Sequence, residues 1–174
     1  SYQEYQESNY QDYVLFSIAN SRIIPRNLIE NHKVQHAINY HNALLPSYAG
    51  TNPTTWAIIN GEKKHGVTWH KISGEIDAGD IIRQEEIPIS REDTTYSLNM
   101  KCTQKALALF KILLSDLSNN QLQFQAQALN KRSYFSLNHS LKNHGFINGC
   151  ESLTQISRYC HALDFGGDQS NQIA

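Results

Sequence analysis

The sequence is short of cysteine, of proline and of long apolar runs, and each shortage excludes a class of protein. The three cysteines, Cys102, Cys150 and Cys160, are far apart and form no CxxC pair, which argues against a disulfide framework and a zinc knuckle. The longest apolar runs, such as residues 106–114, fall well short of the roughly 20 residues that cross a bilayer. The first twelve residues are polar and do not resemble a signal peptide. We therefore expect a cytoplasmic protein with no membrane partner.

Net charge is also nearly absent. The chain has fifteen Lys and Arg residues and 16 Asp and Glu residues, so its net charge is −1 and its isoelectric point is about 6.7. Without a basic patch, a nucleic-acid partner is not expected. Hydrophobic residues make up 40% of the 174, which suffices for the core of one domain with a small appendage.

Strand and helix signals alternate along the first sixty residues. Apolar, β-rich runs predict strands at 14–18, 37–41, 66–72 and 81–89, with a further one near 124–128. Capping residues and 3.6-residue periodicity predict helices at 25–31, 53–60, 94–117 and 152–163. Pro53 and Gly61 mark the start and the end of the second, and Asp93 or Thr94 would cap the third. The third also has an apolar stripe, formed by Leu98, Cys102, Ala106, Leu109, Leu113 and Leu117. This order predicts an α/β fold with a Rossmann-like sheet flanked by helices. Its first strands would run parallel, and the two strands on either side of residues 73–80 would pair antiparallel.

Two polar side chains lie near the carboxyl end of the second predicted strand. Asn39 and His41 are two residues apart and therefore point to the same face. Ligands of open parallel sheets bind beyond the carboxyl ends of the strands, so this is where chemistry is expected. A carboxamide beside an imidazole can hold a carbonyl oxygen and manage a proton, although a histidine here could equally be structural.

A carboxylate could complete this pair. Asp77 lies in the turn-rich connection between the two strands predicted to be antiparallel. Close to His41 it would favour the imidazolium and orient the ring, whereas the alternative is an ordinary turn aspartate.

The histidine pairs also raise the question of a metal. His65 and His70 are five residues apart, and His32 and His36 are four apart at a predicted helix end. Because zinc sites use three or four ligands, no metal site is expected. Trp56 and Trp69 are expected in the core.

Two motifs contain the candidate residues. One is Asn39-Tyr-His41-Asn-Ala-Leu-Leu-Pro46-Ser-Tyr-Ala-Gly50. The other is Gly66-Val-Thr68 followed by Ile76-Asp77-Ala-Gly79-Asp-Ile-Ile82. Together they resemble the N-x-H-x-x-L-L-P-x-x-x-G and G-x-T … L-D-x-G-x-x-I signatures of the formyltetrahydrofolate-dependent transferases. The resemblance extends over roughly residues 12–117.

The resemblance implies an activity and a role for each residue. 10-Formyltetrahydrofolate would donate a formyl group to an acceptor amine without a metal. Asn39 would bind the tetrahedral oxyanion, protonated His41 would stabilise it, and Asp77 would tune His41 and position a water that relays protons. The folate pocket is expected at the loop after the first strand and at the Leu-Leu-Pro segment. Its candidate residues are Ser17, Ile18, Arg22, Ile23, Leu44, Leu45 and Pro46.

The resemblance also bears on the layout of the chain and on the acceptor. Residues 1–117 would form the catalytic core, lacking the family's N-terminal βα units, and residues 118–174 a C-terminal extension. Segments 16–20, 65–70 and 162–166 look most like formylation domains of nonribosomal peptide synthetases, so an aminoacyl group on a carrier protein is the expected acceptor. The amine of a nucleotide sugar is the second interpretation. A non-catalytic docking module with the same fold is the alternative of another class.

Overall fold

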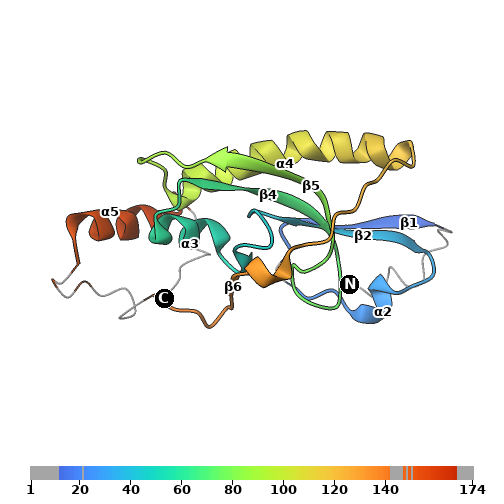
Figure 1. Ribbon diagram of the computed structural model, residues 1–174, viewed down its shortest axis with the longest axis horizontal. Coiled ribbons are helices and arrows are strands. Elements are labelled where there is room, and N and C mark those ends of the chain that lie inside the picture. Colours follow the sequence, from blue (N-terminus) through green and yellow to red (C-terminus); the bar gives the residue numbers. More distant parts are fainter. Residues whose placement is uncertain (1–11, 21, 142–146, 148, 150, 168–174) are drawn as a thin grey trace.

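The computed structural model describes residues 12–20, 22–141, 147, 149 and 151–167, which form a mixed sheet flanked by helices (Figure 1). The four strands lie in the order β1-β2-β4-β5. β1 (Tyr13–Ser17) and β2 (Val34–His41) are parallel, as predicted. β4 (Lys64–Lys71) pairs antiparallel with both β2 and β5 (Ile81–Pro88). The α/β fold class and the antiparallel pair are thereby confirmed.

The connection from β1 to β2 is less helical than the sequence suggests. The predicted helix at 25–31 is a single short helix, α2 (Arg26–Ile29). Asn31 ends it, because its side chain accepts a hydrogen bond from Lys33 N at 3.0 Å and its carbonyl accepts one from Val34 N at 2.9 Å. This turn leads directly into β2, so His36 lies in a strand, and the prediction of a helix end there is wrong.

The long helix α4 (Thr95–Ser118) covers one face of the sheet (Figure 1). Thr94 caps it through a reciprocal pair of hydrogen bonds with Ser97, at 3.2 Å and 3.0 Å. The predicted apolar stripe is buried and packs on side chains of β2, β4 and β5, Trp69 among them. Its buried members are Leu98, Cys102, Ala106, Leu109 and Leu113, and the last predicted member, Leu117, is partly buried against the same core. The main core therefore lies between α4 and the sheet, which leaves the other face free to carry polar groups.

Two further helices close the same end of the molecule. α3 (Pro53–Asn60) begins and ends as predicted, with Pro53 in its first turn and Gly61 beyond its end at a φ of 69°. α5 (Leu153–Ala162) packs against α3, and the buried Thr95 hydroxyl donates to Ala162 O at 2.7 Å. Trp56 of α3 is buried, as is Trp69. No helix in the described part of the chain combines the length and the apolar character that a membrane crossing needs.

The segment that follows α4 returns across the sheet toward α3 (Figure 1). The predicted strand near 124–128 is wrong, because only Gln125 pairs, through two 2.8 Å backbone hydrogen bonds with Ile81. A short 3-10 helix, η1 (Leu129–Lys131), and the strand β6 (Tyr134–Phe135) follow. β6 pairs in parallel with β3 (Ala49–Gly50), inside what the sequence indicated was a loop.

Candidate active site

The strand register places three polar side chains in a row across the sheet. Ser17 of β1 lies opposite Asn39 of β2, which lies opposite His70 of β4. Residues paired across neighbouring strands project to the same face, and His41 shares this face because it is two residues beyond Asn39. Ile38 and Tyr40, on either side of Asn39, point to the other face, where Ile38 belongs to the α4 core and Tyr40 packs against it. The alternation of β2 thus separates packing residues from site residues.

Asp77 completes the cluster from the connection between β4 and β5. Its Oδ2 lies 3.5 Å from His41 Nδ1, and its Oδ1 lies 3.5 Å from Asn39 Nδ2. The side chains of His41 and Asp77 are only 8% and 9% exposed, so their interaction is little screened by water. The structure therefore brings together the three residues that the two motifs single out, although 38 positions separate Asn39 from Asp77.

The imidazole of His41 lies between two hydrogen-bond acceptors. Nε2 is 2.8 Å from Tyr48 O, and Nδ1 faces the Asp77 carboxylate. A neutral ring carries only one N–H and can satisfy one of these contacts, whereas the imidazolium satisfies both. Burial nevertheless lowers the pKa of His41, with the Asp77 carboxylate and the Tyr48 carbonyl acting in the opposite direction. The ring is thus held neutral in a geometry that suits its charged form.

Asp77 is held as a carboxylate. Burial favours its neutral form, but the neighbouring His70 and His41 side chains and the backbone N–H of Gly50 together lower the pKa of Asp77 below its ordinary value. Gly50 N donates to Oδ2 at 2.9 Å. A proton that arrives at His41 Nδ1 therefore meets a charge of opposite sign.

His70 is a site residue whose role the sequence did not indicate. The ring is 2% exposed, and its Nδ1 lies 2.9 Å from Lys71 O, so Nδ1 carries the proton and donates it. Nε2 is then the acceptor that receives Asn39 Nδ2–H at 3.1 Å, and it lies 3.4 Å from Asp77 Oδ1. Knowledge of the β2–β4 register would have revealed this contact, since the two residues are direct partners.

A family model described as formyl transferase matches residues 3–112, a span that includes Asn39, His41 and Asp77. The chain belongs to the formyl transferase family. Among curated proteins, the chain is 31% identical over 158 residues to GDP-perosamine N-formyltransferase of Brucella melitensis. That alignment covers 91% of the chain and 59% of the relative. The chain is also 31% identical over 139 residues to methionyl-tRNA formyltransferase of Alkaliphilus oremlandii. That alignment covers 80% of the chain and 44% of the relative.

Solved structures of the family have the same fold. One is WlaRD, a sugar 3N-formyl transferase crystallised with dTDP and 5-N-formyl-THF, at a TM-score of 0.76 and 31% identity. Another is the N-formyltransferase of Helicobacter canadensis in complex with folinic acid and dTDP-3-aminofucose, at a TM-score of 0.76 and 30% identity. The alignments cover 86% of this chain in both cases, and 53% and 54% of the solved chains. This chain thus spans little more than half the length of these solved relatives.

The residues expected to line a folate pocket form two groups in the structure. Ser17, at the end of β1, is buried beside Asn39, whereas Ile18 is half-exposed and Ile23 is 82% exposed. Arg22 is exposed, in a turn where its backbone N–H donates to Asn20 Oδ1 at 3.0 Å.

The second group is the Leu44-Leu45-Pro46 segment. Leu45 is buried, its N–H donates to Thr68 Oγ1 at 3.3 Å, and its carbonyl accepts from Gln84 Nε2 at 2.9 Å. Leu44 and Pro46 on either side are partly exposed, and the Leu45–Pro46 peptide bond is cis. The segment is therefore fixed to β4 and β5 on the polar side of the sheet.

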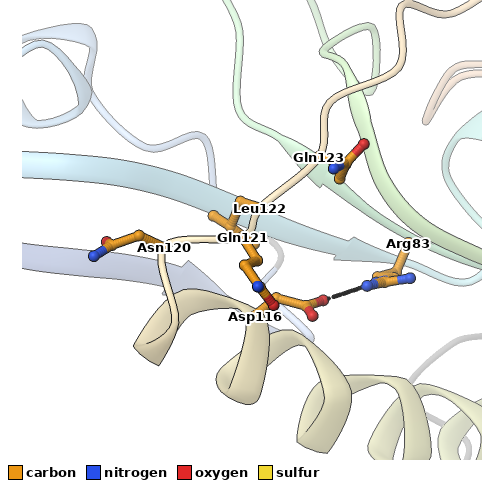
Figure 2. Close-up of a pocket in the computed structure, with 6 residues that line it drawn as sticks. All are labelled: Arg83, Asp116, Asn120, Gln121, Leu122 and Gln123. Atoms are coloured by element: carbon orange, nitrogen blue, oxygen red, sulfur yellow. Dashed lines mark hydrogen bonds and ion pairs between the residues drawn. The ribbon is translucent and has the colours of Figure 1, made fainter.

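A surface cavity lies away from the cluster of Asn39, His41 and Asp77. Figure 2 shows it between β5 and the end of α4, where Arg83 Nε donates to Asp116 Oδ2 at 3.0 Å. It shares no lining residue with the cluster around Asp77, and its acid and base already neutralise each other. Among the described residues, no group of three or more His, Cys, Asp or Glu side chains could hold a metal ion.

Proposed function

We propose that this protein moves a formyl group from 10-formyltetrahydrofolate to the amine of a nucleotide-linked amino sugar. The observation that carries the reaction is the meeting of Asn39, His41 and Asp77 on one face of the sheet. Two of the solved relatives named above were crystallised with a formyl-folate, 5-N-formyl-THF in one and folinic acid in the other.

The relatives also bear on the acceptor. One acts on GDP-perosamine by its name, and another is bound to dTDP-3-aminofucose. The aminoacyl group on a carrier protein, which the sequence favoured, has no counterpart among the relatives described here. The nucleotide sugar is therefore the better-supported acceptor.

The proposed reaction needs a group to bind the oxyanion. As the amine attacks the formyl carbon, the new C–N bond forms and the π electrons of the C=O bond move onto the oxygen. Asn39 supplies a donor: the contact from its Nδ2 to Asp77 is long, at 3.5 Å, so the formyl oxygen can replace Asp77 as the partner of one N–H.

His41 and Asp77 would then transfer the proton. His41 Nδ1 accepts the proton released by the attacking amine, and Asp77 stabilises the imidazolium that forms. When the C–N10 bond breaks, His41 returns this proton to N10 of tetrahydrofolate, so the ring ends neutral as it began. A water between Asp77 and the amine would complete the relay.

We assign the donor pocket to Ser17, Ile18, Arg22, Ile23, Leu44, Leu45 and Pro46. Residues 1–117 would constitute the catalytic core and residues 118–174 an extension of it. A cytoplasmic location fits the two described cysteines, Cys102 and Cys160, which are free thiols.

The test is a transfer assay with the longest natural form of the protein that contains this chain. Labelled 10-formyltetrahydrofolate would be offered with a panel of nucleotide amino sugars and a panel of aminoacyl carrier proteins. We expect label only in a nucleotide sugar. His41→Ala should lower the rate by about 100-fold or more, whereas His32→Ala, an exposed histidine in a turn, should not.

A thermal-shift assay with a stable formyl-folate analogue separates binding from catalysis. His41→Ala should retain the shift, because the proposal gives His41 no part in donor affinity. If the label appears only in the carrier proteins, the acceptor is an aminoacyl group on a carrier and not a nucleotide sugar. Absence of both transfer and thermal shift would favour the non-catalytic docking module.

A further inference from the structure

A glutamine outside both family motifs holds the turn that carries Asp77. Gln127 Nε2 lies 2.9 Å from Asp77 O and 2.6 Å from Gly79 O. Both partners are carbonyls, which only accept hydrogen bonds, so the NH₂ end of the amide must face them. One side chain from the segment after α4 thus uses both of its N–H groups on one turn.

The backbone at Asp77 needs such support. Its φ of 52° lies in the left-handed region, which residues with a Cβ rarely adopt. Gln127 holds the carbonyl of this residue, and Gly50 N holds the carboxylate at 2.9 Å. The position of the carboxylate opposite His41 is thereby fixed from two sides.

The contact is not explained by packing alone. Gln127 Oε1 is buried and has no hydrogen-bond partner among the described residues, which is an unfavourable way to place an amide. An apolar side chain of the same length would avoid this orphaned acceptor but would leave the two carbonyls of the turn without their donor.

The segment around Gln127 is itself anchored. Arg132 Nη2 donates to Ile76 O at 2.8 Å, and Nη1 is 3.1 Å from Glu75 Oε1. On the other side, Gln125 pairs with Ile81 through two backbone hydrogen bonds. Gln127 is therefore presented to the turn from a fixed backbone on both sides.

We propose that Gln127 is a positioning residue for formyl transfer, which acts by holding Asp77 in the orientation that faces His41 and Asn39. This proposal rests on the function proposed above. The hydrogen bonds of Gln127 go to the backbone of the Asp77 turn, so its loss should act on the chemical step and leave donor and acceptor binding unchanged.

The first experiment compares Gln127→Glu and Gln127→Leu with the parent protein. Gln127→Glu keeps the size and replaces the N–H donors by oxygen, and Gln127→Leu removes the donors without adding charge. We expect each to lower kcat by about tenfold or more, with both KM values changed by less than about twofold. Gln123→Glu, the same change at an exposed position of the same segment, should leave kcat and KM unchanged.

A double-variant cycle distinguishes positioning from general destabilisation. In an Asp77→Asn background, Gln127→Leu should cost little further activity, because the carboxylate that it positions is already gone. Losses that simply multiply would overturn the proposal, as would a proportional rise in KM. Circular dichroism checks folding first, and if Gln127→Glu does not fold, Gln127→Leu carries the comparison.

The two proposals fail in different ways. If His41→Ala is inactive but both Gln127 variants have the parent kcat, the positioning role is wrong and the formyl transfer proposal stands. If His41→Ala keeps the parent rate, the proposed function itself is wrong.

Discussion

Asn39 and His70 lie directly opposite each other on β2 and β4, with Asn39 Nδ2 3.1 Å from His70 Nε2. Because His70 Nδ1–H donates to Lys71 O, the lone pair on Nε2 faces Asn39. The buried imidazole therefore decides which end of the carboxamide faces it. His70 thus sets the direction of the group that we assign to the oxyanion.

This relationship predicts that His70→Leu lowers kcat by about tenfold or more, because the Asn39 carboxamide loses the acceptor that orients it. His70→Gln should recover part of the loss, since its amide oxygen can accept the same hydrogen bond. Steady-state kinetics on both variants provide the measurement. Equal rates for the two variants and the parent would show that His70 only fills space.

A second prediction concerns the pH dependence of stability. Burial lowers the pKa of His65 to about 4, with the Asn42 carbonyl, 2.6 Å from Nε2, opposing this shift and His41 adding to it. In the unfolded chain His65 takes up a proton near pH 6.5, whereas in the folded protein it does so only near pH 4. The free energy of unfolding therefore falls as the pH drops from about 6.5 to 4. The loss attributable to His65 should be roughly 3 kcal/mol.

Urea unfolding at several pH values between 7 and 4 measures the slope of the free energy of unfolding against pH. His65→Gln should flatten it, whatever the variant costs at pH 7, whereas the exposed His32→Gln should leave it unchanged. A slope that is the same in His65→Gln and in the parent would contradict the assignment.

The third prediction uses two glycines of the same loop. A Cβ at Gly79 would lie 1.8 Å from Lys71 O, whereas a Cβ at Gly74 would meet nothing within 4 Å. Gly79→Ala should therefore destabilise the protein by about 1–3 kcal/mol and displace Asp77, while Gly74→Ala should be nearly neutral. Thermal unfolding and the transfer assay report the two effects. A Gly79→Ala variant that matches Gly74→Ala in both would refute this account of the loop.

Local patterns predicted much of the fold. The Pro53 start and Gly61 end of α3, the Thr94 cap and the apolar stripe of α4 are local signals, and each agrees with the structure. The failures have physical reasons: Asn31 closes a turn that shortens α2, and Gln125 finds a single backbone partner where a strand was expected.

For the site, sequence and structure diverge where contacts are long-range. The motifs and the alternation of β2 indicated Asn39, His41 and Asp77, and the structure places them together. The sequence did not indicate Gln127, because a lone polar residue in an irregular segment has no periodicity and no capping pattern. The two-residue strands β3 and β6 were equally invisible, since each is too short to have a pattern of its own.

The pairing of β3 with β6 has a consequence for synthesis of the chain. Phe135 O accepts a hydrogen bond from Thr51 N at 2.8 Å, next to the Gly50 N–H that binds Asp77. Phe135, which holds this loop in place, is therefore synthesised 84 residues after Thr51. A nascent chain that has left the ribosome only as far as the end of α4 already contains every residue of the triad. The Asp77 carboxylate is held in its final position only when about twenty more residues have emerged and β6 can pair with β3. The sheet therefore folds before the site becomes competent for catalysis.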